Sequence, residues 1–238
     1  VVHNPGPWLL SIEYPPAPHL MSQPISLCAF FTAFMVLKNR ACGDRCSLAC
    51  GRGGVCSRHQ RRRGLMAEFD TLNVLLERRY SCRGFKPDPV PENKIRQIVM
   101  RAGKVPSWCN AQPWQVTITQ GAATQAFKDE LKHAVQNTVP KSDFPWPDSY
   151  PGVYGDRRRA CGYQLYAAAG IARQDRQARE AQSLRNFDLF DAPHVAIVHS
   201  EAALGPYGAL DCGGFVSAFM LAATSLGVAC IAQASIAA

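Results

Sequence analysis

The first 65 residues contain no apolar run long enough to cross a bilayer. Their longest such run, residues 25–37, has 13 residues, whereas a transmembrane helix needs about 20. Apart from His3, nothing basic precedes this run, and no clean small-residue cleavage site follows it. The pattern of a secretory signal is therefore missing as well. We expect a protein without membrane association.

The sequence also lacks the short motifs of several common enzymes. H-E-x-x-H, G-x-S-x-G and a phosphate-cradling glycine loop do not occur, which argues against the usual hydrolase and kinase classes. The N-terminal cysteines do not have the paired C-x-x-C spacing of a zinc ribbon. The residues concerned are Cys42, Cys46, Cys50, Cys56 and His59. We expect no metal site.

The basic excess of the chain is confined to one end. Of the formal net charge of +8, the residues before Met66 contribute eight Lys or Arg minus two Asp or Glu, which is +6, and the remainder contributes 18 minus 16, which is +2. The arginine runs at 61–63 and 157–159 have no interleaved aromatic residues. They fit solvated surfaces better than a nucleic-acid groove, and no nucleic-acid partner is expected.

The cysteines after residue 66 are widely scattered in apolar or motif contexts. Such thiols are typical of small buried side chains in a reducing compartment. We therefore expect no disulfide framework among them, and a cytoplasmic location. They are Cys82, Cys109, Cys161, Cys212 and Cys230.

Residues 1–65 differ in pattern from the rest of the chain. Residues 1–23 are rich in proline and aromatic residues without a period, and residues 38–63 mix Cys, Gly and Arg. Met66 begins a well-patterned helix. We interpret 1–65 as an atypical extension that is disordered or not native, and 66–238 as one domain. A mature start upstream of Met66 in natively expressed protein, found by N-terminal sequencing, would contradict the second interpretation.

Downstream of Met66 the hydrophobic periodicity becomes regular. Several segments repeat apolar residues at helical spacing, and three short ones have the apolar character of strands. Because helices outnumber the strands and connect them, we expect an α+β sandwich with helices on both faces of a sheet. The expected strands are 115–119, 194–199 and 228–231, and the expected helices are 66–78, 92–103, 125–135, 156–169, 173–185 and 207–226.

The segment that follows the first helix is suited to holding an anion. Arg79, Ser81 and Arg83 alternate, so in an extended chain their side chains point the same way, about 7 Å apart. Guanidinium groups bind phosphate through charge-assisted, bidentate bonds. The alternative is a surface cluster of salt bridges, because charged runs usually face water.

A second segment, 106–114, places amide, hydroxyl and indole groups in a loop bounded by prolines. Its sequence is Pro-Ser-Trp-Cys-Asn-Ala-Gln-Pro-Trp. Such a loop can line a flat aromatic ligand. The alternative is a rigid turn with a core tryptophan, which we favour for Trp114 because it enters a strand.

In this order, with the prolines of 89–91 between them, the two segments resemble the start of the FMN-dependent nitroreductase family. Further likenesses occur at 144–154, 157–159 and 190–194, where the sequence is similar to the branch that reduces nitroaromatic compounds. The resemblance covers about residues 66–238, and no single motif carries it alone.

The resemblance implies a mainly antiparallel sheet flanked by helices, with FMN at the interface of a homodimer. The residues expected to hold the FMN phosphate and ribityl chain are Arg79, Tyr80, Ser81 and Arg83. The loop residues expected to reach the flavin bound mainly by the partner are Pro106, Ser107, Trp108 and Asn110. The residues expected to close the site from the opposite side are Ala232, Gln233 and Ala234.

The resemblance further implies an oxidoreductase. FMN would accept a hydride from NADH or NADPH and pass electrons, in ping-pong order, to a small nitroaromatic or quinone-like acceptor lying against Trp108, Phe144 and Trp146. Because the cofactor carries the redox chemistry, no catalytic acid, base or nucleophile is assigned. Two alternatives stay open: reductive dehalogenation or another flavin chemistry on this scaffold, and a catalytically silent flavin-binding fragment.

The sequence departs from the family pattern near its end. The family often has proline at the position of Ala232, and its chain continues through another strand and a C-terminal extension. We therefore expect a C-terminally truncated domain, which would weaken both FMN binding and dimerisation.

Overall fold

The computed structural model describes residues 2–3, 9–12, 29–39 and 57–236, and side-chain environments from residue 67 onward. Its centre is one six-stranded sheet. Across the sheet the strands lie in the order β1 (Val2–His3), β2 (Leu9–Ile12), β4 (Gln115–Gln120), β5 (His194–Glu201), β3 (Ala29–Asn39) and β6 (Val228–Gln233). Every neighbouring pair of strands is antiparallel, whereas the family resemblance implies a mixed, mainly antiparallel sheet.

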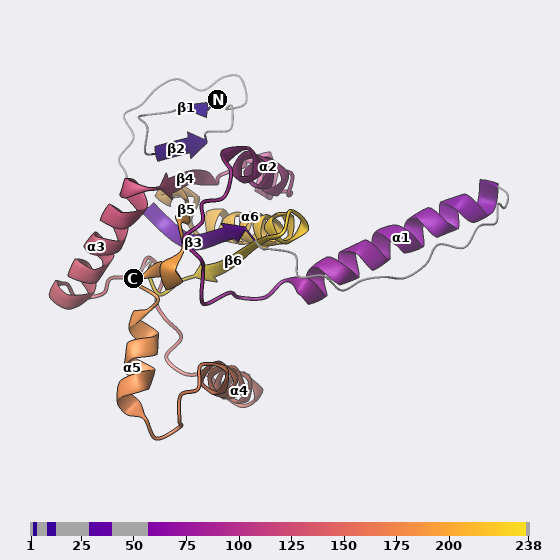
Figure 1. The fold of residues 1–238 in the computed structure, drawn as a ribbon. Coiled ribbons are helices and arrows are strands. Elements are labelled where there is room, and N and C mark those ends of the chain that lie inside the picture. The colour runs from indigo at the N-terminus through magenta and orange to yellow at the C-terminus, as the bar shows by residue number, and fades with distance from the viewer. Residues whose placement is uncertain (1, 4–8, 13–28, 40–56, 237–238) are drawn as a thin grey trace.

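Helices cover both faces of this sheet, which confirms the predicted α+β sandwich. The helices α2 and α6 lie on one face and α3 lies on the other, while α1, α4 and α5 extend away from the sheet (Figure 1). The helices are α1 (Ser57–Arg78), α2 (Glu92–Ala102), α3 (Ala122–Asn137), α4 (Val153–Ala168), α5 (Arg176–Leu184) and α6 (Gly205–Ser225).

The larger hydrophobic core lies between the sheet and the pair α2 and α6. Along β4 and β5 the residues that face this core alternate with those that face the other side, as the pleat of a strand requires. The Trp114 ring stacks on Phe215 of α6 with ring centroids 5.4 Å apart, and Phe219 lies 6.2 Å beyond. Trp114 is therefore a core residue, as predicted. One face of α2 is buried as well: Ile95, Ile98, Val99 and Ala102.

A second core fills the opposite face. It joins Phe85, Leu189, Phe190 and Ile231 to partly buried residues of α3, among them Phe127 and Leu131. Val135, further along the same helix, is exposed. The reason is that α3 runs past the edge of the core before it ends at Asn137.

Two observations bear on the expected boundary at Met66. The helix α1 begins at Ser57 instead of Met66. The strand β3, upstream of that boundary, lies between β5 and β6 and pairs with both. Whether the first 65 residues belong to the natural protein remains the hypothesis stated above.

Close packing of α6 against β5 gives a prediction for Gly208. A Cβ at this position would lie 2.9 Å from the Ser200 Oγ and 3.0 Å from the Leu204 Cβ. Overpacking of this kind costs about 1–3 kcal/mol, so Gly208→Ala is expected to lower the free energy of unfolding in urea by that amount.

Gly213→Ala is the matched control in the same helix, because nothing lies within 4 Å of its Cβ and alanine favours a helix by about 1 kcal/mol. Equal stability of the two variants would contradict the close approach.

His194 is a structural residue at the start of β5. Its Nε2 accepts a hydrogen bond of 2.9 Å from the Val90 amide, so Nδ1 carries the proton and donates to the Thr119 carbonyl at 3.1 Å. Burial lowers the pKa of His194, and the Thr119 bond opposes this only in part. The ring is therefore held neutral between a loop and the neighbouring strand.

The lowered pKa of His194 makes the fold sensitive to acid. In the unfolded chain the pKa returns to about 6.5, so below that pH the unfolded state binds the proton more readily than the folded state. Stability from this residue is present above about pH 6.5 and is lost as pH falls through it toward the folded pKa. We expect the urea concentration at the midpoint of unfolding to decrease as the pH is lowered from neutral to acidic. His194→Gln should flatten this fall, whereas the exposed His133→Gln should not; an unchanged slope in His194→Gln would contradict the assignment.

Candidate functional site

The loop after α2 has an unusual backbone. It contains the 3-10 turn at Trp108–Asn110, and Cys109, Asn110 and Gln112 have φ angles of 50°, 55° and 47°. A left-handed conformation costs a residue other than glycine about 1–2 kcal/mol. Such strain persists where the surrounding structure enforces it and gathers at ligand-binding segments. The loop predicted to reach a flavin is therefore a held, strained segment.

Helix α6 holds this loop in place. Both carboxylate oxygens of Asp211 accept from the Trp108 amide, at 3.2 and 3.1 Å. The Trp108 ring lies 5.1 Å from that of Tyr207, one turn earlier in α6. Within the loop, the Gln112 amide donates to the Ser107 Oγ at 2.9 Å. Asp211 and Tyr207 were not predicted from the sequence, because they lie about a hundred residues from the loop and belong to no motif.

The loop leaves its indole outside. Trp108 is 62% exposed, and Cys109 and Asn110 are exposed as well. Cys109 was predicted to be a small buried thiol, and that is wrong, because the left-handed turn directs it out of the core. Cys161 is also exposed, since α4 packs little of its surface. Cys82, Cys212 and Cys230 are buried as predicted, and burial raises the pKa of Cys212 to about 11 and that of Cys230 to about 12.

The arginine segment runs beside β6. Ser81 forms a parallel bridge with Cys230, and the Cys82 amide donates to the Cys230 carbonyl at 3.3 Å. Cys82 points into the core, whereas Ser81 and Arg83 are exposed and Arg79 is half-buried. Burial therefore alternates over residues 81–83, as an extended segment requires, whereas Tyr80 is exposed as well. In the described part of the chain, neither Arg79 nor Arg83 forms a salt bridge, which argues against the surface-cluster interpretation.

The end of β6 contributes one buried polar side chain. Gln233 is 4% exposed, and its Nε2 donates to the Asn186 Oδ1 at 3.0 Å and to the Asn186 carbonyl at 3.2 Å. Its Oε1 is buried and has no hydrogen-bond partner among the described residues. Ala232 and Ala234 are exposed on either side. Asn186 is a neighbour that the sequence did not reveal.

The structure brings some of the predicted site residues together and separates others. Ala232 lies two residues beyond the bridge from Ser81 to Cys230, as does Arg83, so these two parts are adjacent. The loop is bound near Asp211, whereas Tyr80 shares a small cavity with Thr224 at the other end of α6. Asp211 and Thr224 are thirteen positions apart in the helix, which corresponds to a distance of about 20 Å along its axis. Within one chain, the arginine segment and the loop are therefore far apart.

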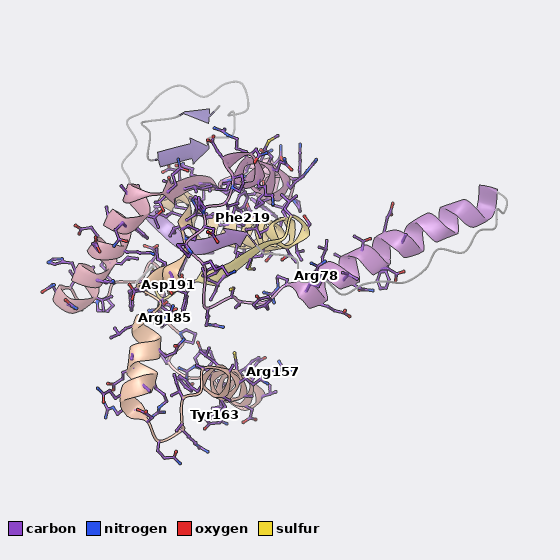
Figure 2. The ribbon with its side chains drawn as sticks, in the orientation of Figure 1. Arg78, Arg157, Tyr163, Arg185, Asp191 and Phe219 are labelled. Atoms are coloured by element: carbon purple, nitrogen blue, oxygen red, sulfur yellow. The ribbon has the colours of Figure 1, made fainter. Side chains whose placement is uncertain are left out.

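The predicted acceptor residues lie in the connection between α3 and α4. Phe144 is half-buried and Trp146 is exposed. Nearby, Arg158 lies 5.0 Å from the centre of the Tyr150 ring, and Arg159 forms an ion pair with Asp156. Figure 2 shows Arg157 and Tyr163 at the same periphery. The arginine run of α4 is thus a solvated helix face, as predicted.

Two further predictions concern metals and membranes. Among the described residues, no cluster of His, Cys, Asp or Glu could hold a metal ion; the N-terminal cysteines lie outside the described residues. One described helix, spanning residues 202–225, is long and apolar enough to cross a membrane by length and composition. Its apolar character has another cause, because Phe215 and Phe219 of this helix are core residues.

Comparison with known proteins decides the family. The model of the nitroreductase family matches residues 76–238. The chain belongs to the nitroreductase family. This confirms the resemblance drawn from the sequence. Among curated relatives, nitroreductase NfnB of Mycolicibacterium smegmatis is 35% identical over 161 residues, covering 67% of this chain and 69% of its own. The 4-nitrobenzoate reductase of Pseudomonas putida is 31% identical, covering 71% and 74%.

A solved nitroreductase has the same fold. The FMN-dependent nitroreductase NfnB from Mycobacterium smegmatis, in complex with NADPH, superposes with a TM-score of 0.67 at 33% identity, covering 71% of this chain and 76% of that one. The nitroreductase fold is thereby established for this chain.

Proposed function

We propose that this nitroreductase is an FMN-dependent NAD(P)H oxidoreductase that reduces nitroaromatic or quinone-like acceptors by ping-pong hydride transfer. The relatives are named as nitroreductases and nitrobenzoate reductases. The observation in this chain that carries the proposal is the pair of arginines without salt bridges beside β6, next to the exposed Ala232. When bound, FMN would supply the acceptance of hydride and the donation of electrons.

The residues present fit such a cofactor at its phosphate end. Arg79, Ser81 and Arg83 present two guanidiniums and a hydroxyl along one side of an extended segment. Each charge-assisted bond contributes about 1.5–3 kcal/mol. Tyr80, half exposed beside them, would cover the ribityl chain.

At the ring end, the fit depends on a buried hydrogen-bond acceptor that lacks a donor among the described residues and on the backbone near the exposed Ala232 and Ala234. The buried Oε1 of Gln233 lacks a donor, and a buried acceptor without one costs about 1–3 kcal/mol. A ring N–H would satisfy it. Ala232 and Ala234 would approach the ring through their backbone, while Pro106, Ser107, Trp108 and Asn110 would offer amide and side-chain donors to the charge that develops on reduction.

We propose that two copies of the chain build each site. The two ends of the predicted site lie about 20 Å apart along α6 in one chain, so a second copy is needed to bring a loop to the arginine segment. Helix α1 presents an apolar face that the described residues of one chain leave exposed. Its most exposed members are Phe69, Leu72 and Leu76, which share one side of the helix. An uncovered face of this kind marks an interaction surface.

The proposed location is the cytoplasm. All five cysteines in the described part of the chain are free thiols, and free thiols persist in reducing compartments.

Anaerobic steady-state kinetics with NADPH and 4-nitrobenzoate test the proposed function. FMN-loaded protein should oxidise NADPH continuously only when the acceptor is present, beyond the one equivalent per flavin that the reductive half-reaction takes, and reciprocal plots at several acceptor concentrations should be parallel, as ping-pong order requires. Intersecting lines would reject that order. Flavin binding without NADPH consumption would support the silent alternative, and release of halide from a halogenated phenol in place of nitro reduction would support dehalogenation.

Trp146 gives a prediction for acceptor binding. Trp146→Ala is expected to raise the KM for 4-nitrobenzoate about 5- to 30-fold, because loss of an aromatic contact costs about 1–2 kcal/mol. The KM for NADPH should change little. Tyr163→Ala, an exposed aromatic residue on α4, is the matched control. An unchanged acceptor KM in Trp146→Ala would remove Trp146 from the acceptor site.

A further inference from the structure

A cavity of about 370 Å³ lies apart from the proposed flavin site, at the start of α3. It belongs to the size range of small-molecule sites. None of its lining residues is among those proposed to hold FMN or the acceptor. They are Pro87, Pro89, Gly121, Thr124, Gln125, Lys128, Asp191, Ala192 and Pro193.

The walls of this cavity are largely apolar and rigid. Pro87, Pro89 and Pro193 supply rings on two opposing segments, and proline has no amide N–H to bind a ligand. The Thr124 hydroxyl is engaged elsewhere, with the Thr119 hydroxyl at 2.9 Å and the Pro193 carbonyl at 3.0 Å. The walls therefore suit the flat apolar body of a small molecule.

The carboxylates around the cavity already have partners. Asp191 binds the Arg185 guanidinium at 2.5 Å, and the two residues are adjacent in Figure 2. Asp188 binds the Lys132 ammonium at 2.5 Å, and Asp129 accepts from the Gln125 amide at 2.9 Å.

Lys128, in contrast to Arg185 and Lys132, forms no ion pair with a described carboxylate. It lines the cavity, and no described carboxylate lies within ion-pair distance of its ammonium group. It is partly buried, and this burial lowers the pKa of Lys128 even though Asp191 and Asp188 oppose the shift. An anionic ligand group would therefore meet a cation that forms no ion pair among the described residues, although Asp191 and Asp188 are close enough to act on it.

A strained turn fixes the wall that faces Lys128. Leu189, Phe190 and Asp191 have φ angles of 55°, 50° and 67°, three consecutive left-handed residues without a glycine. Leu189 and Phe190 are fully buried, and the Phe190 carbonyl accepts from the Phe85 amide at 2.9 Å. A left-handed conformation is unfavourable for a residue other than glycine, so three in succession make a strained turn. Strain of this kind is concentrated where a site must be held in shape.

We propose that this cavity is a second small-molecule site, which binds a compact organic acid with its carboxylate on the Lys128 ammonium and its flat apolar body between the prolines. Gly121, the residue that precedes α3, forms part of the wall. The positive end of the helix dipole of α3 therefore also favours a negatively charged group in the cavity. The proposal does not depend on the proposed flavin chemistry.

Protection of Lys128 from amine acetylation, read by peptide mass spectrometry, tests the proposal. The full chain is saturated with FMN first, so that an aromatic acid does not simply fill the flavin site. At ten times its dissociation constant, sodium benzoate should slow acetylation of Lys128 about tenfold, while Lys132, one turn further along α3, keeps its rate. Equal rates for Lys128 with and without benzoate would overturn the proposal.

Two further probes and one variant separate charge from shape. Benzyl alcohol has the ring without the charge, and inorganic phosphate has the charge without the ring; neither should protect Lys128 as benzoate does. Protection by phosphate equal to that by benzoate would overturn the claim of an organic-acid site. Gln125→Trp, at an exposed lining position, should fill the cavity and abolish the benzoate effect. Persistence of that effect would also contradict the proposal.

Discussion

Replacement of both Arg79 and Arg83 by alanine is expected to weaken FMN binding by about two to four orders of magnitude. Each guanidinium loses a charge-assisted contact worth about 1.5–3 kcal/mol, and every 1.4 kcal/mol is about tenfold in affinity. Neither side chain forms a salt bridge among the described residues, so the fold loses little. Quenching of FMN fluorescence during titration measures the dissociation constant.

The control for this prediction is Arg101→Ala, an exposed arginine at the end of α2. It removes one positive charge without touching the proposed phosphate site, so it should leave FMN affinity within about twofold of the parent. Circular dichroism should show the same melting temperature for all three proteins. If the double variant bound FMN as well as Arg101→Ala does, these arginines would not be the phosphate anchor.

Phe219→Ala is expected to lower the free energy of unfolding by about 3–5 kcal/mol. The Phe219 side chain is fully buried between the sheet and α2, next to Phe215. Its removal leaves a cavity that the packed strands can close only in part. Urea denaturation followed by circular dichroism measures the loss.

Leu184→Ala is the matched large-to-small control at an exposed position at the end of α5. It should change the free energy of unfolding by less than about 0.5 kcal/mol. A similar small loss in Phe219→Ala would mean that α6 does not pack on the sheet as described.

Local patterns in the sequence predict much of the fold. The strands at 115–120, 194–201 and 228–233 and the buried face of α2 follow from apolar periods within each segment. Trp114 was also predicted as a structural residue, because it enters an apolar strand. These features depend on residues close together in the chain.

Features made by distant residues could not be predicted in this way. The contact between the Trp108 amide and Asp211 joins residues 103 positions apart, and Asp211 belongs to no motif. The left-handed turn at 189–191 has no glycine to mark it. The place of β3 between β5 and β6 depends on pairing across most of the chain, which no local period specifies.

The exposed parts of the candidate site have a different explanation. The apolar face of α1 and the indole of Trp108 have the composition of buried surface, yet one chain leaves them open. Apolar composition predicts that a side chain is buried, but it does not indicate whether the same chain or a second copy covers it. The proposed dimer would account for both features.

The most direct test of the proposed flavin site is reconstitution of the purified full chain with FMN, followed by anaerobic addition of NADPH. The flavin absorbance bands should appear in proportion to protein, at one FMN per chain, and should bleach when NADPH is added. Protein that stays colourless after incubation with FMN, or bound flavin that keeps its absorbance with NADPH, would contradict the account.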